Sequence, residues 1–71
     1  MQSLDLLAEK YVGKECTLAV GSTGKDMPAI IRHGDGPRFA YVTTYPSGIQ
    51  FCWHWDAVDL IMTHKNGRFV A

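Results

Sequence analysis

Two cysteines and three histidines are the side chains best suited to chemistry here, because such groups ligate zinc and act as nucleophile and base. They are Cys16, Cys52, His33, His54 and His64. None of them has the close Cys-x-x-Cys or His-x₃-His spacing of a structural zinc site. Cys52 and His54 would lie about 7 Å apart along a strand, too far for the hydrogen bond that activates a cysteine. We therefore expect no metal, no cofactor and no catalytic residue.

The size of the chain argues against an enzyme as well. Its 71 residues form a single domain, residues 1–71, which has little wall from which to build a water-excluding pocket. The N-terminal sequence "MQSLDLLAEKY" does not resemble an export signal, and no apolar run approaches the ~20 residues that cross a membrane. We expect a non-enzymatic cytoplasmic protein whose two thiols are reduced.

Aromatic side chains are concentrated between residues 39 and 55, close to several basic residues. Trp, Tyr and Arg are enriched in protein interfaces, and aromatic side chains next to Arg or Lys also stack bases and contact phosphates. The pattern predicts a binding surface whose aromatic centre has basic residues at its rim. Its candidate residues are Arg38, Tyr41, Tyr45, Trp53, Trp55, Lys65 and Arg68.

Charge favours one class of partner over the other. The seven basic and seven acidic side chains give a formal net charge of zero, which lacks the excess of positive charge typical of nucleic-acid binding. We therefore expect an adaptor or inhibitor domain that binds a protein partner or self-associates. The alternative is a protein that binds single-stranded RNA or DNA by stacking bases on the same aromatic side chains.

The N-terminal segment carries the clearest helix signal. Ser3 can cap a helix over residues 3–12, and Gly13 stands where a left-handed residue would end it. Between them, apolar residues recur at the spacing i, i+3, i+4 and i+7, which predicts one buried stripe. The stripe consists of Leu4, Leu7, Ala8 and Tyr11.

From residue 15 onward the apolar period changes to two, which is typical of strands. "GSTGKD" predicts a turn or a mobile loop. Pro28 is expected at the start of a strand or on an edge, and Asp56 is expected to cap a short turn over residues 57–59. The Asn-Gly pair after Lys65 predicts a type I′ hairpin that returns the last strand antiparallel to the preceding one. The predicted strands are residues 15–20, 27–33, 38–45, 49–55, 60–64 and 68–71.

The aromatic segment is predicted to be a hairpin. Its "PSG" sequence favours a type I turn in a three-residue loop, residues 46–48, which pairs Tyr45 with Ile49. This register places all aromatic side chains of residues 39–55 on one face, because strand side chains alternate, and Cys52 on the other. The aromatic face is either the core or an exposed platform.

We favour the core, covered by the helix stripe, because so small a domain cannot leave that much apolar area exposed. Part of the aromatic set would then stay accessible at an edge or a subunit interface. A short N-terminal helix followed by five to six short antiparallel strands predicts a mainly β fold of the α+β class. The layout resembles the small SH3-like and Sm-like barrels, with a curved sheet carrying the helix on one face as the alternative.

Overall fold

In the computed structural model, which describes residues 3–21 and 24–71, two helices and five strands follow one another in a mixed α+β arrangement. The elements in chain order are α1 (Leu4–Tyr11), β1 (Glu15–Val20), β2 (Lys25–His33), β3 (Phe39–Thr44), β4 (Gln50–His54), α2 (Trp55–His64) and β5 (Arg68–Val70).

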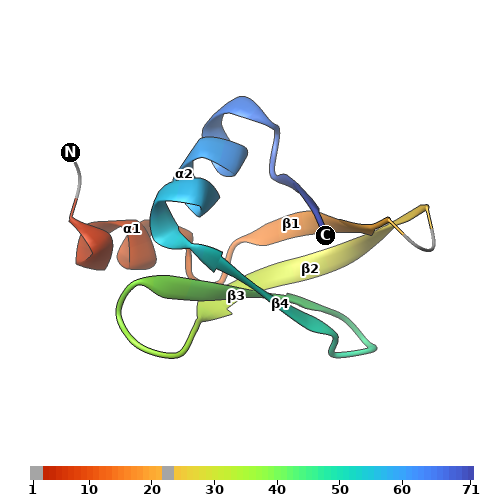
Figure 1. The fold of residues 1–71 in the computed structure, drawn as a ribbon, viewed down its shortest axis with the longest axis horizontal. Helices are drawn as coiled ribbons and strands as arrows, with labels where there is room; N and C mark the ends of the chain where they lie inside the picture. Colours follow the sequence, from red (N-terminus) through yellow and green to blue (C-terminus); the bar gives the residue numbers. More distant parts are fainter. Residues whose placement is uncertain (1–2, 22–23) are drawn as a thin grey trace.

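The five strands form one curled sheet in the order β4-β3-β2-β1-β5 (Figure 1). Neighbouring strands are antiparallel except for β1 and β5, which are parallel. Helix α2 leads directly from one edge strand, β4, to the other, β5, and stands over the concave face of the sheet. The sheet therefore curls like part of a barrel, with its two edge strands on either side of α2.

The predicted N-terminal helix is confirmed. The Ser3 side chain caps α1 by accepting a hydrogen bond from the Leu6 N–H at 3.3 Å, and Gly13 follows the helix with a φ of 86°. Such a positive φ favours glycine, which has no Cβ to clash. The predicted apolar stripe faces the core, where its buried members are Leu7, Ala8 and Tyr11.

The first four predicted strands are confirmed, with small shifts in their bounds. β2 begins at Lys25, so Pro28 lies within the strand rather than at its start. The Pro28 carbonyl accepts a hydrogen bond from the Tyr45 N–H, just beyond the last pair of the ladder between β2 and β3. Because proline has no N–H, one hydrogen bond is missing at this end of the ladder and none is missing in its interior. The predicted "GSTGKD" turn includes residues 22–23, which lie outside the described residues.

The predicted register of the central hairpin is wrong by one residue. Tyr41 pairs with Cys52 rather than with Trp53, so the loop contains four residues, not three. The buried Thr44 side chain closes this longer loop: its hydroxyl accepts from the Ile49 N–H at 3.0 Å and is hydrogen-bonded to the Ser47 hydroxyl at 2.7 Å. The Tyr45–Pro46 peptide bond in this loop is cis.

The second helix replaces a predicted turn and strand. Residues 57–64 belong to α2, and its N-cap is His54, whose Nδ1 accepts from the Asp56 N–H at 3.1 Å. Asp56 lies in the first turn instead of capping it. Trp55, Val58 and Met62 follow a helical spacing and pack into the core, which explains why this segment is a helix.

The Asn-Gly pair has the predicted backbone conformation, but it does not lie in the predicted hairpin. Asn66 and Gly67 both have positive φ, at 55° and 70°, but they end α2 instead of joining two antiparallel strands. A Cβ at the buried Gly67 would approach the Met62 sulfur at 3.3 Å, so a glycine fits best there. The residues that follow form β5, which pairs in parallel with β1 rather than antiparallel with a preceding strand.

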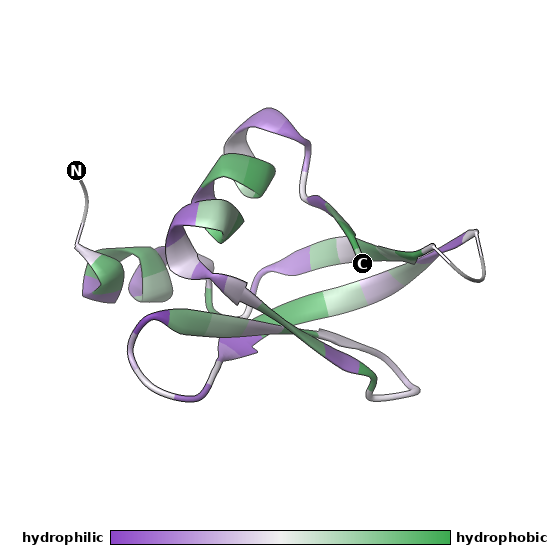
Figure 2. Ribbon diagram, in the orientation of Figure 1, coloured by the Kyte–Doolittle hydropathy of each residue, from purple (hydrophilic) through white to green (hydrophobic). Residues whose placement is uncertain are grey.

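The core lies between the concave face of the sheet and the two helices. Hydrophobic residues colour long stretches of β2 and β3 and part of α2, whereas the loop between β2 and β3 is purple to white (Figure 2). The Tyr11 hydroxyl donates to the Asp59 carboxylate at 2.5 Å, which ties α1 to α2. The buried core consists of Leu7, Ala8, Tyr11, Leu18, Ala29, Ile31, Ala40, Val42, Trp55, Val58 and Phe69.

Candidate functional site

The corrected register divides the aromatic segment between two faces. On β3, Ala40 and Val42 are buried in the core, so their neighbours Phe39 and Tyr41 lie on the convex face. Ala40 pairs with Trp53 and Val42 pairs with Phe51, so both of these β4 rings lie on the concave face. The predicted single aromatic face does not exist.

Trp55 is a core residue and not part of a binding surface. Only 1% of its surface is exposed, and its ring packs edge-on against His33 with centroids 6.4 Å apart. The sequence placed it on the aromatic face because β4 was expected to continue through it. Since α2 begins at this residue instead, its side chain points under the helix into the core.

Three of the predicted site residues do come together around one pocket. Trp53 on β4, Lys65 after α2 and Arg68 on β5 line a pocket of about 430 Å³ at the opening between the two edge strands. Ile61 on α2 and Val70 on β5 supply the rest of its apolar wall, and Asn66 completes it. We refer to it as the seam pocket.

The fold holds the walls of the seam pocket in place. The Trp53 ring packs edge-on against the buried Phe69 ring, with centroids 5.0 Å apart, which fixes one wall to the core. On the outer side, the Arg68 guanidinium donates to both carboxylate oxygens of Asp26 on β2, at 3.0 and 3.4 Å. Arg68 is thus positioned and partly neutralised, which leaves Lys65 as the more available cation.

Both strands beside the seam pocket present backbone groups to the opening. Trp55 N–H donates to the Arg38 carbonyl and Thr44 N–H to the Ile49 carbonyl, so the odd-numbered residues at this edge bond to β3. Because antiparallel pairing alternates, the amide groups of Gln50 and Cys52 point away from β3. Within the described residues, β4 therefore has a free edge.

β5 also presents backbone groups to the opening. Its carbonyl and amide bonds to β1 run through the odd-numbered residues, as when Ala71 N–H donates to the Ala19 carbonyl at 2.8 Å and Thr17 N–H to the Gly67 carbonyl at 2.9 Å. The amide groups of Val70 consequently face the opening, and 61% of the Val70 side chain is exposed.

The remaining predicted residues, Arg38, Tyr41 and Tyr45, do not line the seam pocket. The Tyr41 hydroxyl donates to the Asp35 carboxylate at 2.6 Å, and this hydrogen bond raises the pKa of the Tyr41 hydroxyl. The exposed Tyr45 hydroxyl lies 3.4 Å from a Glu15 carboxylate oxygen. Arg38 is exposed in the segment just before β3. This group does not form a site with Trp53.

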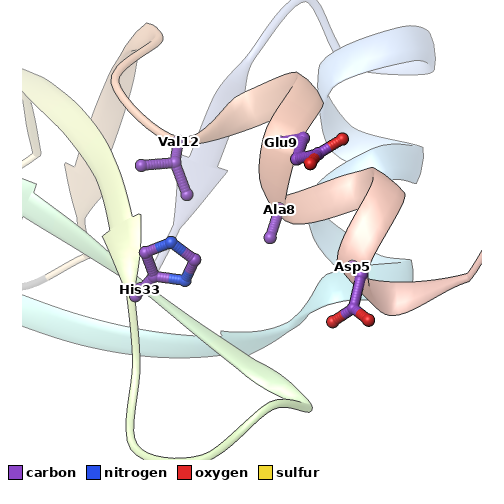
Figure 3. A pocket seen from close by; sticks show the side chains of 5 residues that line it. All are labelled: Asp5, Ala8, Glu9, Val12 and His33. Atoms are coloured by element: carbon purple, nitrogen blue, oxygen red, sulfur yellow. The ribbon is translucent and has the colours of Figure 1, made fainter.

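A second pocket, of about 560 Å³, lies between α1 and the end of β2 (Figure 3). Asp5 and Glu9 project from α1, and the His33 ring lies across from them beside Val12. Among residues 3–21 and 24–71, however, no three His, Cys, Asp or Glu side chains lie close enough to hold a metal ion. The described side chains of this pocket therefore do not form a metal site.

The two cysteines have different surroundings. Cys16 on β1 is partly buried, and burial raises the pKa of its thiol to about 11. Cys52 on the convex face of β4 is exposed. In the part of the chain that the structure covers, no hydrogen bond joins either thiol to a histidine.

Neither helix in the described residues is long and apolar enough to cross a bilayer.

We expect the two thiols to react with iodoacetamide at very different rates. A pKa of about 11 leaves roughly one Cys16 thiol in a thousand ionised at about pH 8, and the thiolate is the reactive form. Cys52 should therefore be alkylated first, whereas the Cys16 rate should rise about tenfold per pH unit until about pH 11. Mass spectrometry of the native protein, with Cys52→Ser as control, measures both rates. Equal rates at the two positions would contradict this placement of Cys16.

Sequence reasoning missed the apolar wall of the seam pocket. Ile61 was assigned to a strand, although the spacing of Trp55, Val58 and Met62 carries a helical signal that could have placed it on α2. Val70 was assigned to the last predicted strand, residues 68–71, with no expected role. No signal in the sequence predicts that β5 lies next to β1 and hence across from β4.

No protein-family model, curated protein or solved structure matches this chain. The assignment of function therefore depends on the geometry of the candidate site itself.

Proposed function

We propose that this protein is a non-enzymatic binding domain that captures an extended segment of a partner protein at the seam pocket. The observation that carries the proposal is an apolar pocket, walled by Trp53, Ile61 and Val70, at the opening between two free strand edges. Its volume of about 430 Å³ falls in the range of ligand pockets and accommodates one large side chain.

The chemistry of the pocket defines the bound segment. An apolar side chain would bury its surface against Trp53 and Ile61, and a neighbouring carboxylate would meet the Lys65 ammonium at the rim. The backbone of the segment would pair with the outward amide groups of Val70, as in other cases where a peptide adds a strand to a sheet edge. The preferred ligand is thus an extended peptide with an apolar residue next to Asp or Glu.

Single-stranded nucleic acid fits the same residues less well. The tyrosines that were expected to stack bases, Tyr41 and Tyr45, have carboxylates beside their hydroxyls, which would repel phosphates. Arg68 is already paired with Asp26, and Trp55 is buried. These contacts support a protein partner.

We also infer that the fold belongs with the small SH3-like barrels, in which exposed aromatic side chains hold extended ligands. The curled five-stranded sheet supports this inference, because the last strand in the chain, β5, pairs with the first strand in the chain, β1. In this chain α2 joins β4 to β5 where such a barrel would close.

Selection from a phage-displayed library of short random peptides tests the proposal. We expect the selected peptides to carry an apolar residue beside Asp or Glu, and their affinity to fall at least about tenfold in a Val70→Asp variant. Val70 is exposed, so the substitution should leave the fold intact while it places a carboxylate in the apolar wall.

The matched control is Leu60→Asp, since Leu60 is a similarly exposed apolar residue (54%) on α2 outside the pocket. It should bind the selected peptides like the unchanged protein. An equal loss in both variants, or no selected peptide, would overturn the proposal. Tighter binding of fluorescent oligo(dT) that weakens steeply with added salt would favour nucleic acid instead.

A further inference from the structure

The free edge of β4 lacks the features that normally prevent one sheet from pairing with another. Natural edge strands are usually very short, or carry Lys, Pro or a bulge. β5 has only three residues and begins with Arg68, whereas β4, "QFCWH", has five residues with no Lys, Arg or Pro. Its outward amide groups belong to Gln50 and Cys52, together with the His54 N–H. An edge of this kind is suited to pairing with another strand.

We propose that the β4 edge pairs antiparallel with the β4 edge of a second copy of this chain, with the two-fold axis at Cys52. Residues whose backbone groups point away from β3 must pair with the same kind of residue in the second copy. The possible registers of the two strands therefore differ from one another by shifts of two residues. The register centred on Cys52 is the one that pairs all five residues of the strand with their counterparts.

In this register, the β4 side chains of one copy are complementary to those of the second copy on both faces of the sheet. On the convex face Gln50 lies opposite His54 of the second copy, which avoids a pair of like charges. On the concave face Phe51 lies opposite Trp53 of the second copy. These two rings are only partly buried within one chain, where their centroids lie 6.4 Å apart. Aromatic pairs across strands stabilise a sheet, so a second copy is the partner that fits this edge.

The proposed dimer edge shares Trp53 with the seam pocket, whereas the cation Lys65 and the β5 wall of that pocket do not take part in the pairing. The pairing makes a specific prediction for the exposed Cys52 thiol. Residues that face each other in a hydrogen-bonded pair have Cα atoms about 5.5 Å apart, within the range that a disulfide spans. The two Cys52 thiols of a dimer are therefore positioned for cross-linking.

Light scattering over a range of concentrations, combined with oxidation by diamide, tests the dimer. Diamide takes two electrons and two protons from the two thiols and becomes the hydrazine, while one S–S bond forms. We expect a dimer mass and a covalent dimer that forms rapidly. Cys52→Ser should keep the dimer mass and lose the cross-link.

Cys52→Lys should raise the dimer dissociation constant at least about tenfold, because it places two ammonium groups opposite each other at the axis. Gln50→Lys, also at an exposed position, serves as a second edge variant and should act in the same direction. Val70→Asp should leave the dimer unchanged, which separates this inference from the proposed function. A monomer mass at every concentration, or a dimer that persists in both lysine variants, would overturn it.

Discussion

Replacing Trp55 with alanine should lower the free energy of unfolding by about 3–5 kcal/mol, the usual cost of truncating a fully buried large aromatic side chain. Trp55 has 1% of its surface exposed, opens α2 and packs against His33, so its loss leaves a cavity beneath the helix. A domain of 71 residues has a total stability of roughly 4–10 kcal/mol. The variant should therefore be close to unfolded, which urea denaturation followed by circular dichroism measures.

Trp53→Ala is the matched comparison, because Trp53 is only partly buried and lines the seam pocket. It should remain folded with a smaller loss of stability and bind the selected peptides poorly. The fluorescence of two single-tryptophan proteins separates the two residues further, with Trp53→Ala to report Trp55 and the conservative Trp55→Phe, rather than the destabilised Trp55→Ala, to report Trp53. Trp55 should emit at shorter wavelength and resist quenching by iodide, whereas Trp53 should be quenched. The opposite assignment would contradict the corrected register of the hairpin.

Replacing Phe69 with alanine should cost a similar amount, about 3–5 kcal/mol, for a different reason. Phe69 is fully buried and is the residue through which the three-residue β5 contacts the core and the Trp53 ring. Without it β5 has little apolar area to hold it against β1. We expect the C-terminal strand to detach and the seam pocket to be lost with it.

Val70→Ala provides the control on the same strand, since the exposed Val70 side chain contributes little to the core. Its stability should change by less than about 0.5 kcal/mol. Amide hydrogen exchange measures the detachment directly: in Phe69→Ala the N–H of Ala71, which donates to Ala19, should lose protection. Undiminished protection at Ala71 would show that β5 is held by other contacts.

Elements with local signals were predicted well. Ser3, Gly13 and an apolar stripe between them define α1, and a period of two defines the first four strands. α2 was missed because its apolar residues "LIM" are consecutive, and a short run of this kind fits a strand as well as a helix. The Asn-Gly pair reinforced the error, since positive φ at Asn66 and Gly67 ends a helix as readily as it turns a hairpin.

Features that depend on tertiary contacts were not predictable. The hairpin register depends on the Thr44 hydroxyl, which adds one residue to the loop, and no pattern in the sequence reports that bond. An error of one residue moves every side chain of a strand to the other face. Ile61 and Val70, which line the seam pocket beside Trp53, Lys65 and Arg68, were not predicted for other reasons: the α2 segment was assigned to a strand, and the position of β5 beside β1 has no local signal.

The parallel pair of β1 and β5 also determines how the chain would respond to tension applied at its two ends. In parallel neighbours, pulling the start of one strand against the end of the other loads the bonds between them in shear, so that they must break together. Here those bonds include Thr17 N–H to the Gly67 carbonyl and Gly21 N–H to the Ala71 carbonyl. Antiparallel hairpins pulled at their open ends unzip one bond at a time. The first and last strands thus form a mechanical clamp, and the force at which it opens is governed by the rate of unfolding.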